Sequence, residues 1–158
     1  MASSKLNYFL LRSFFIVLFF IGCGERDDFV FPEVYMYATL NVQTDAEYML
    51  LAQPGSSLAI TMHPNGNSTI GYNNNGIIVF NNGDDSRPFY AFDRTCPHDL
   101  PANYALECDG SMATCPHCGS VYVLPGEGIP SSNSVSRRYL KQYRTSYNIN
   151  TGTLVISN

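Results

Sequence analysis

Two short clusters of cysteine and histidine lie close together in the second half of the chain. The first reads Cys-Pro-His from residue 96, and the second, sixteen residues later, reads Cys-Pro-His-Cys from residue 115. Thiolate and imidazole groups are the ligands that zinc and iron–sulfur centres take from proteins. Four such residues in two tight groups are hard to explain by packing alone. We therefore predict a metal centre at Cys96, His98, Cys115 and Cys118.

A tight turn between the two clusters is expected to bring them together. Asp109 and Gly110 both tolerate the positive φ that a type I′ turn requires, so the residues around them are predicted to form a β-hairpin. The chain then folds back and sets the second cluster against the first. The ligands would lie on two neighbouring loops at one tip of the fold.

The spacing of the ligands resembles that of Rieske-type iron–sulfur domains, which bind a 2Fe–2S cluster with Cys-x-His in one loop and Cys-x-x-His in the next. Cys96 and His98 match the first pair, and Cys115 matches the start of the second. The resemblance covers about residues 76–158 and implies a 2Fe–2S cluster and single-electron transfer. Cys118 stands where the family has histidine. Because thiolate is anionic and imidazole is neutral, this replacement disfavours the reduced state and predicts a lower reduction potential.

Three residues beside the expected ligands have implied roles. Ser120 resembles the serine that donates to a bridging sulfide, and Tyr122 resembles the tyrosine that donates to a cysteine sulfur. Such donors stabilise the reduced cluster, although packing within a strand explains both residues equally well. His117 is predicted to face solvent beside the cluster, and its alternative role is that of a ligand in place of Cys118.

Other chemistries fit the same residues. Cys-Pro-x-Cys-Gly is also the loop of zinc ribbons and rubredoxin-like sites, and zinc accepts a Cys3His set. In an oxidising compartment Cys96, Cys115 and Cys118 could pair as disulfides and leave a structural or binding protein without metal. Cys-Pro-His-Cys is also the active motif of a family of thiol–disulfide oxidoreductases, which needs its first thiolate at a helix N-terminus. The residues after Cys118 are typical of a strand, which disfavours this last alternative.

The N-terminal segment is typical of an export signal. Lys5 and Arg12 precede an uncharged run that ends at a small residue before Cys23, as in the signal peptides of bacterial lipoproteins. We predict that residues 1–22 are the signal peptide, that Cys23 carries the lipid, and that residues 23–32 form an acidic tether. The protein is then expected in the cell envelope, held by its lipid at the periplasmic face or the cell surface. An uncleaved membrane helix and a plain secretory signal are the alternatives.

Residues 33–158 are predicted to form one all-β domain, a Rieske-like antiparallel sandwich or barrel whose metal-binding part covers about residues 94–132. Short segments rich in strand-forming residues, among them 48–52 and 76–80, alternate with Gly-, Pro- and Asn-rich turns. The net charge of −4 and the lack of a basic stripe argue against nucleic-acid binding. The chain shows no evident catalytic base. We therefore expect an electron carrier with an unidentified protein partner rather than a stand-alone enzyme.

Overall fold

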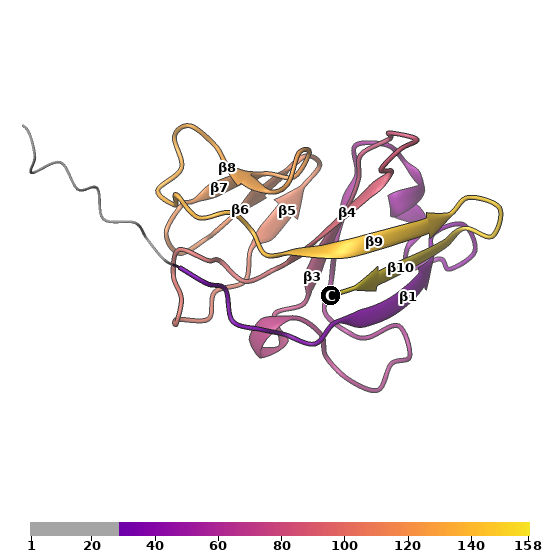
Figure 1. Ribbon diagram of the computed structural model, residues 1–158, viewed down its shortest axis with the longest axis horizontal. Coiled ribbons are helices and arrows are strands. Elements are labelled where there is room, and N and C mark those ends of the chain that lie inside the picture. The colour runs from indigo at the N-terminus through magenta and orange to yellow at the C-terminus, as the bar shows by residue number, and fades with distance from the viewer. Residues whose placement is uncertain (1–28) are drawn as a thin grey trace, which may run out of the picture. The chain divides into compact units, whose positions relative to one another are not determined.

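Strands supply most of the regular structure of residues 29–158, the part of the chain that the computed structural model describes (Figure 1). Two single turns of 3-10 helix, η2 (Met49–Ala52) and η3 (Tyr72–Asn74), interrupt them. The strands are β1 (Tyr37–Asn41), β2 (Ser57–Ile60), β3 (Ile77–Asn81), β4 (Phe89–Asp93), β5 (Glu107–Asp109), β6 (Met112–Thr114), β7 (Val121–Val123), β8 (Ile129–Pro130), β9 (Gln142–Asn148) and β10 (Thr153–Ser157). The prediction of an all-β fold is confirmed.

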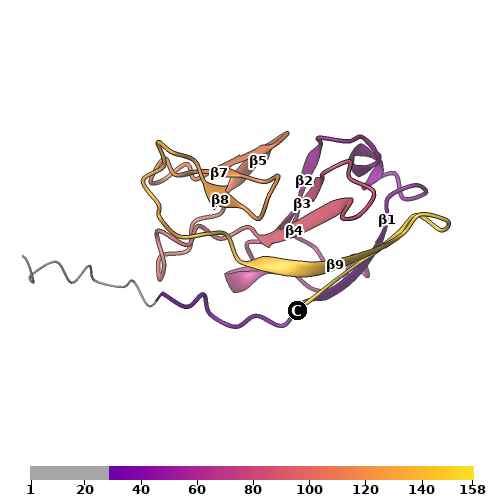
Figure 2. The same ribbon diagram turned by 45° about the horizontal axis from the view of Figure 1, so that its top comes forward.

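The strands form two antiparallel sheets. The larger sheet has the order β1-β10-β9-β4-β3-β2, and the smaller has the order β5-β6-β7-β8. Figure 2 shows β7 and β8 set apart from the sheet that contains β9. All six strands of the larger sheet contribute side chains to one core, so this sheet curls around its own interior. The arrangement is consistent with a Rieske-like β fold.

Strand β3 connects two hydrophobic cores. Ile77 and Val79 point into the core of the larger sheet, whereas Ile78 and Phe80 pack with residues of the smaller sheet. Successive side chains of a strand point to opposite faces, so a strand that separates two cores must be apolar at every position. This explains the continuous apolar run of residues 76–80, which the sequence predicts as a buried strand.

Two local predictions are wrong. Residues 48–52 form a helical turn instead of a strand. Tyr48 and Leu51 are buried there, and a 3-10 turn places two residues with this three-residue spacing on the same side. The β5–β6 hairpin forms, but Asp109 pairs with Met112, so its loop is Gly110-Ser111. Gly110 has φ 53° and Ser111 does not have positive φ, which is the pattern of a type II′ turn rather than type I′.

The predicted leader lies outside the described residues, and so does Cys23. The proposed boundaries after residues 22 and 32 therefore remain predictions. Within residues 29–158, no helix has the length and apolar character that crossing a membrane requires.

Candidate metal centre

Two loops carry the cysteines that the sequence selects. The first follows β4 and leads to β5, and its base is closed by hydrogen bonds from Cys96 N–H to Tyr104 O (2.9 Å) and from Leu106 N–H to Arg94 O (2.7 Å). The second connects β6 to β7. It is closed by a bond from the N–H of Cys115 to Ser120 O (2.8 Å). Both loops are thus held at their bases by backbone hydrogen bonds, which fixes the cysteines relative to the strands.

Four donor atoms from these loops converge. The Sγ atoms of Cys96, Cys115 and Cys118 and a carboxyl oxygen of Asp99 all lie within 4.8 Å of one another. The Sγ atoms of Cys96 and Cys118 are 3.7 Å apart, and Cys115 Sγ lies 3.1 Å from Asp99 Oδ2. All three cysteines are free thiols. This group could hold a metal ion.

The structure thus brings together three of the four predicted ligands. His98 is exposed and does not belong to the group, and Asp99, one residue later, occupies the remaining position. The role of His98 as a ligand stays a prediction. Cys108 lies on β5, partly buried against the core of the smaller sheet and outside the four-donor group.

His117 lies at the rim of the four-donor group, with about half of its side chain exposed. Its ring stacks on that of Tyr104, with centroids 3.8 Å apart and planes inclined by 6°. Its Nδ1 atom is 3.4 Å from Asp99 Oδ1, whereas the Asp99 side chain is only 8% exposed. His117 therefore contacts both the buried Asp99 side chain and the ring of Tyr104.

Ser120 and Tyr122 each place a hydroxyl beside a cysteine sulfur, whereas the resemblance implies a bridging sulfide as the partner of Ser120. Their roles toward a cluster stay predictions. Ser120 Oγ is 3.0 Å from Cys118 Sγ and also accepts the N–H of Ser136 at 3.0 Å. The hydroxyl of Tyr122 is 3.6 Å from Cys96 Sγ. Both side chains are buried, so each hydroxyl is held in place beside its sulfur.

The surroundings of the group raise the pKa of two of its thiols and lower the pKa of its carboxyl group. Burial raises the pKa of Cys96 and of Cys115, because the apolar surroundings disfavour a thiolate. Burial also acts to raise the pKa of Asp99, but hydrogen bonds from the three thiols and from His117 outweigh it and leave the pKa below its usual value. Without a cation the raised pKa favours the neutral thiol at Cys96 and Cys115. A bound cation would supply the charge that stabilises their thiolates.

A buried hydrogen-bond network positions the first loop. The side chain of Asp93, at the end of β4, is fully buried. Its Oδ2 atom accepts from Tyr72 N–H and from the hydroxyl of Tyr143, both at 2.8 Å, and Oδ1 accepts from Thr95 N–H at 2.9 Å. Thr95 precedes Cys96, so this network fixes the start of the loop.

Sequence reasoning missed both Asp93 and Asp99. A signal for Asp99 exists in the chain, because Cys-Pro-His-Asp from residue 96 repeats the pattern of Cys-Pro-His-Cys from residue 115. Nothing local marks Asp93, because its partner Tyr143 is fifty residues away.

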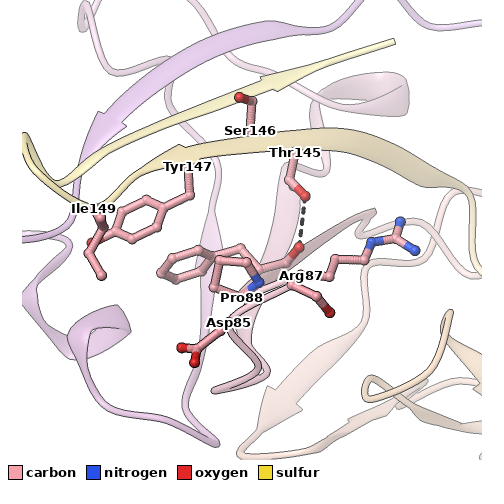
Figure 3. A pocket seen from close by; sticks show the side chains of 9 residues that line it. Asp85, Arg87, Pro88, Thr145, Ser146, Tyr147 and Ile149 are labelled. Atoms are coloured by element: carbon pink, nitrogen blue, oxygen red, sulfur yellow. Dashed lines mark hydrogen bonds between the residues drawn. The ribbon is translucent and has the colours of Figure 1, made fainter.

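A separate cavity of about 620 Å³ lies between the start of β4 and the end of β9 (Figure 3). Its wall includes the hydrogen bond from Thr145 Oγ1 to Phe89 O (2.7 Å). No cysteine or histidine lines it. The residues around it are Asp85, Ser86, Arg87, Pro88, Phe89, Thr145, Ser146, Tyr147 and Ile149.

No family model matches the chain, and no curated protein matches it significantly. A ferredoxin from Sphingomonas yanoikuyae B1 is one solved structure to which the chain is similar. The match covers 69% of this chain and 93% of the ferredoxin, with 18% sequence identity and a TM-score of 0.44.

Proposed function

We propose that the protein binds iron at the two cysteine loops and carries single electrons to a protein partner. The observation that carries this proposal is the convergence of three free thiols and one carboxyl group from two loops. Thiolates are the protein ligands of iron–sulfur centres. Iron held by thiolates exchanges one electron without a bound substrate.

The chain's own residues would bind and shield such a centre. Cys96 and Cys115 are fully buried and would hold the metal from the inner side. The hydroxyls of Tyr122 and Ser120 lie beside sulfurs, where they favour additional negative charge on the ligands. The exposed rim at His117 would let electrons pass to a partner without opening the fold.

The form of the iron is the finer part of the proposal. The Rieske resemblance implies a 2Fe–2S cluster with Cys96, His98, Cys115 and Cys118 as ligands. The converging group takes Asp99 in place of His98. A zinc ion with a structural role is the second candidate, favoured by the close approach of all four donors, since closed tetrahedral sites of this kind suit zinc.

The test is the metal and acid-labile sulfide content of the anaerobically purified protein, with its visible spectrum before and after dithionite. The proposal expects iron and a thiolate-to-iron absorption that bleaches on reduction. Cys115→Ser should lose the iron, and Cys108→Ser, outside the group, should keep it. A colourless protein with one zinc per chain would establish the second candidate instead.

We also propose, from the leader sequence, that a lipid on Cys23 anchors the protein outside the inner membrane. The uncharged run before Cys23 supports this placement. In cell fractionation, wild-type protein should be recovered with membranes and Cys23→Ala should not be lipidated. Equal lipid labelling of both forms would refute the anchor.

A further inference from the structure

The two metal-binding loops repeat one four-residue pattern. The first reads Cys-Pro-His-Asp over residues 96–99 and the second Cys-Pro-His-Cys over residues 115–118. In each loop the first residue is buried, the histidine is exposed, and the fourth residue is half-buried. The first and fourth residues of both loops are the ones that supply the converging donors.

The same two backbone positions lie beside the first sulfur in both four-residue segments. The backbone N–H groups of His98 and Asp99 lie near the sulfur of Cys96, and those of His117 and Cys118 lie near the sulfur of Cys115. Each loop therefore wraps around the sulfur of its first residue. Two N–H donors stabilise a thiolate at that position. Wrapping of this kind returns the fourth side chain to the centre and turns the third outward, so Asp99 is the counterpart of Cys118.

The distances between the donor atoms are close to those around one ion. A tetrahedral ion with metal–sulfur bonds of about 2.3 Å and metal–oxygen bonds of about 2.1 Å separates two sulfurs by about 3.8 Å, and sulfur from oxygen by about 3.6 Å. Cys96 and Cys118 Sγ are 3.7 Å apart, Cys115 Sγ and Asp99 Oδ2 are 3.1 Å apart, and no pair of donor atoms exceeds 4.8 Å. Ligands divided between two bridged irons would lie in two more widely separated pairs.

Asp99 is also oriented for this role. One of its oxygens faces Cys115 Sγ and the other faces His117 Nδ1 at 3.4 Å. A ligating carboxylate that is held by a histidine on its outer side has its orientation fixed. His98 has an exposed side chain, although it belongs to the same loop.

We propose that the two loops bind a single divalent ion that prefers tetrahedral thiolate coordination, zinc or ferrous iron, through Cys96, Asp99, Cys115 and Cys118. This inference rests on the proposed metal centre and names its fourth ligand and its number of ions. On binding, the three thiols form bonds to the ion and release their protons to solvent.

Cobalt(II) is a suitable probe, since its absorption reports tetrahedral geometry and thiolate ligation. The full chain, freed of metal by a chelator under anaerobic conditions, should bind one equivalent with a tetrahedral spectrum. Asp99→Ala should weaken cobalt binding at least about 10-fold, because a ligand is lost. His98→Ala is the matched control from the same loop and should bind within about 2-fold of wild type.

Asp99→Cys is the second variant. It keeps the assignment of Asp99 testable if Asp99→Ala does not fold. It completes a four-thiolate site, so it should bind one cobalt with thiolate-to-metal absorption about one third stronger than wild type. Absence of this gain in a variant that binds cobalt would overturn the assignment of Asp99.

Other results would overturn the inference in distinguishable ways. Strong loss of binding in His98→Ala, with Asp99→Ala unaffected, would make His98 the ligand. Two irons and two sulfides per chain in the native protein would refute a single ion and leave the electron carrier standing. No binding of cobalt, zinc or iron by the wild-type chain would refute both proposals.

Discussion

Replacing Tyr143 with phenylalanine tests how the first metal-binding loop is held. The Tyr143 hydroxyl donates to Asp93 Oδ2 at 2.8 Å inside the core, and both residues are buried. A hydrogen bond to a charged group contributes about 1.5–3 kcal/mol. Asp93 keeps two backbone donors in the variant, so we expect a loss in the lower half of this range, about 1.5–2 kcal/mol.

The assay is urea unfolding of the wild type and of Tyr143→Phe. With a slope of about 1.5 kcal/mol/M, the expected loss shifts the midpoint by about 1 M. Tyr147→Phe is the matched control on the same strand, because within residues 29–158 the Tyr147 hydroxyl has only an exposed contact with Gln43 at 3.3 Å. Its free energy of unfolding should change by no more than about 0.5 kcal/mol.

The difference in free energy of unfolding between wild type and Tyr143→Phe should decrease at high pH. Burial, followed by the charge of Asp93, raises the pKa of Tyr143 above its ordinary value of 10.0. A group whose pKa is raised by folding stabilises the protein below its unfolded pKa and loses that contribution as the pH rises toward the folded pKa. The gap between wild type and Tyr143→Phe should therefore be constant from pH 6 to about 9 and narrow above about 10. Equal midpoints for the two proteins at neutral pH would show that the hydrogen bond from Tyr143 to Asp93 does not stabilise the fold.

Three further substitutions have defined outcomes. Cys96→Ser should lower the metal content of the purified protein strongly, and Cys108→Ser should not, as measured by elemental analysis. Tyr122→Phe removes a hydroxyl 3.6 Å from the sulfur of Cys96. If the centre contains iron, the reduced state loses about 1 kcal/mol of stabilisation, which should lower the reduction potential by roughly 40 mV in voltammetry. Gly128→Ala should destabilise the fold by about 1–3 kcal/mol in urea unfolding, because its φ is +65° and a Cβ would lie 2.9 Å from two side chains. Gly126→Ala, with φ +79° but open space, is its control and should lose less; equal losses would show that crowding does not contribute.

Much of the fold follows from local patterns. The all-β class follows from short strand-forming segments between turns, and β3 is recognisable because both of its faces are apolar. Residues 48–52 have the same composition as a strand, but their burial follows a three-residue spacing set by the neighbouring core. Composition alone does not reveal whether tertiary contacts favour the two-residue period of a strand or the three-residue period of a 3-10 turn.

The sequence predicts the three cysteines of the candidate site but not its fourth donor, Asp99. Cys96, Cys115 and Cys118 follow from spacing, because two loops joined through a hairpin must lie close together. The choice between His98 and Asp99 depends on the path of the loop, which leaves His98 exposed and brings Asp99 to the other donors. The support from Asp93 could not be predicted, because it depends on contacts between residues far apart in the sequence.

The metal content of the full chain, purified without exposure to oxygen, is the decisive measurement for the two cysteine loops. We expect iron or zinc near one equivalent per chain, lost when Cys115 is replaced by serine. A metal-free wild-type protein that takes up neither metal and whose cysteines have formed disulfides would contradict it.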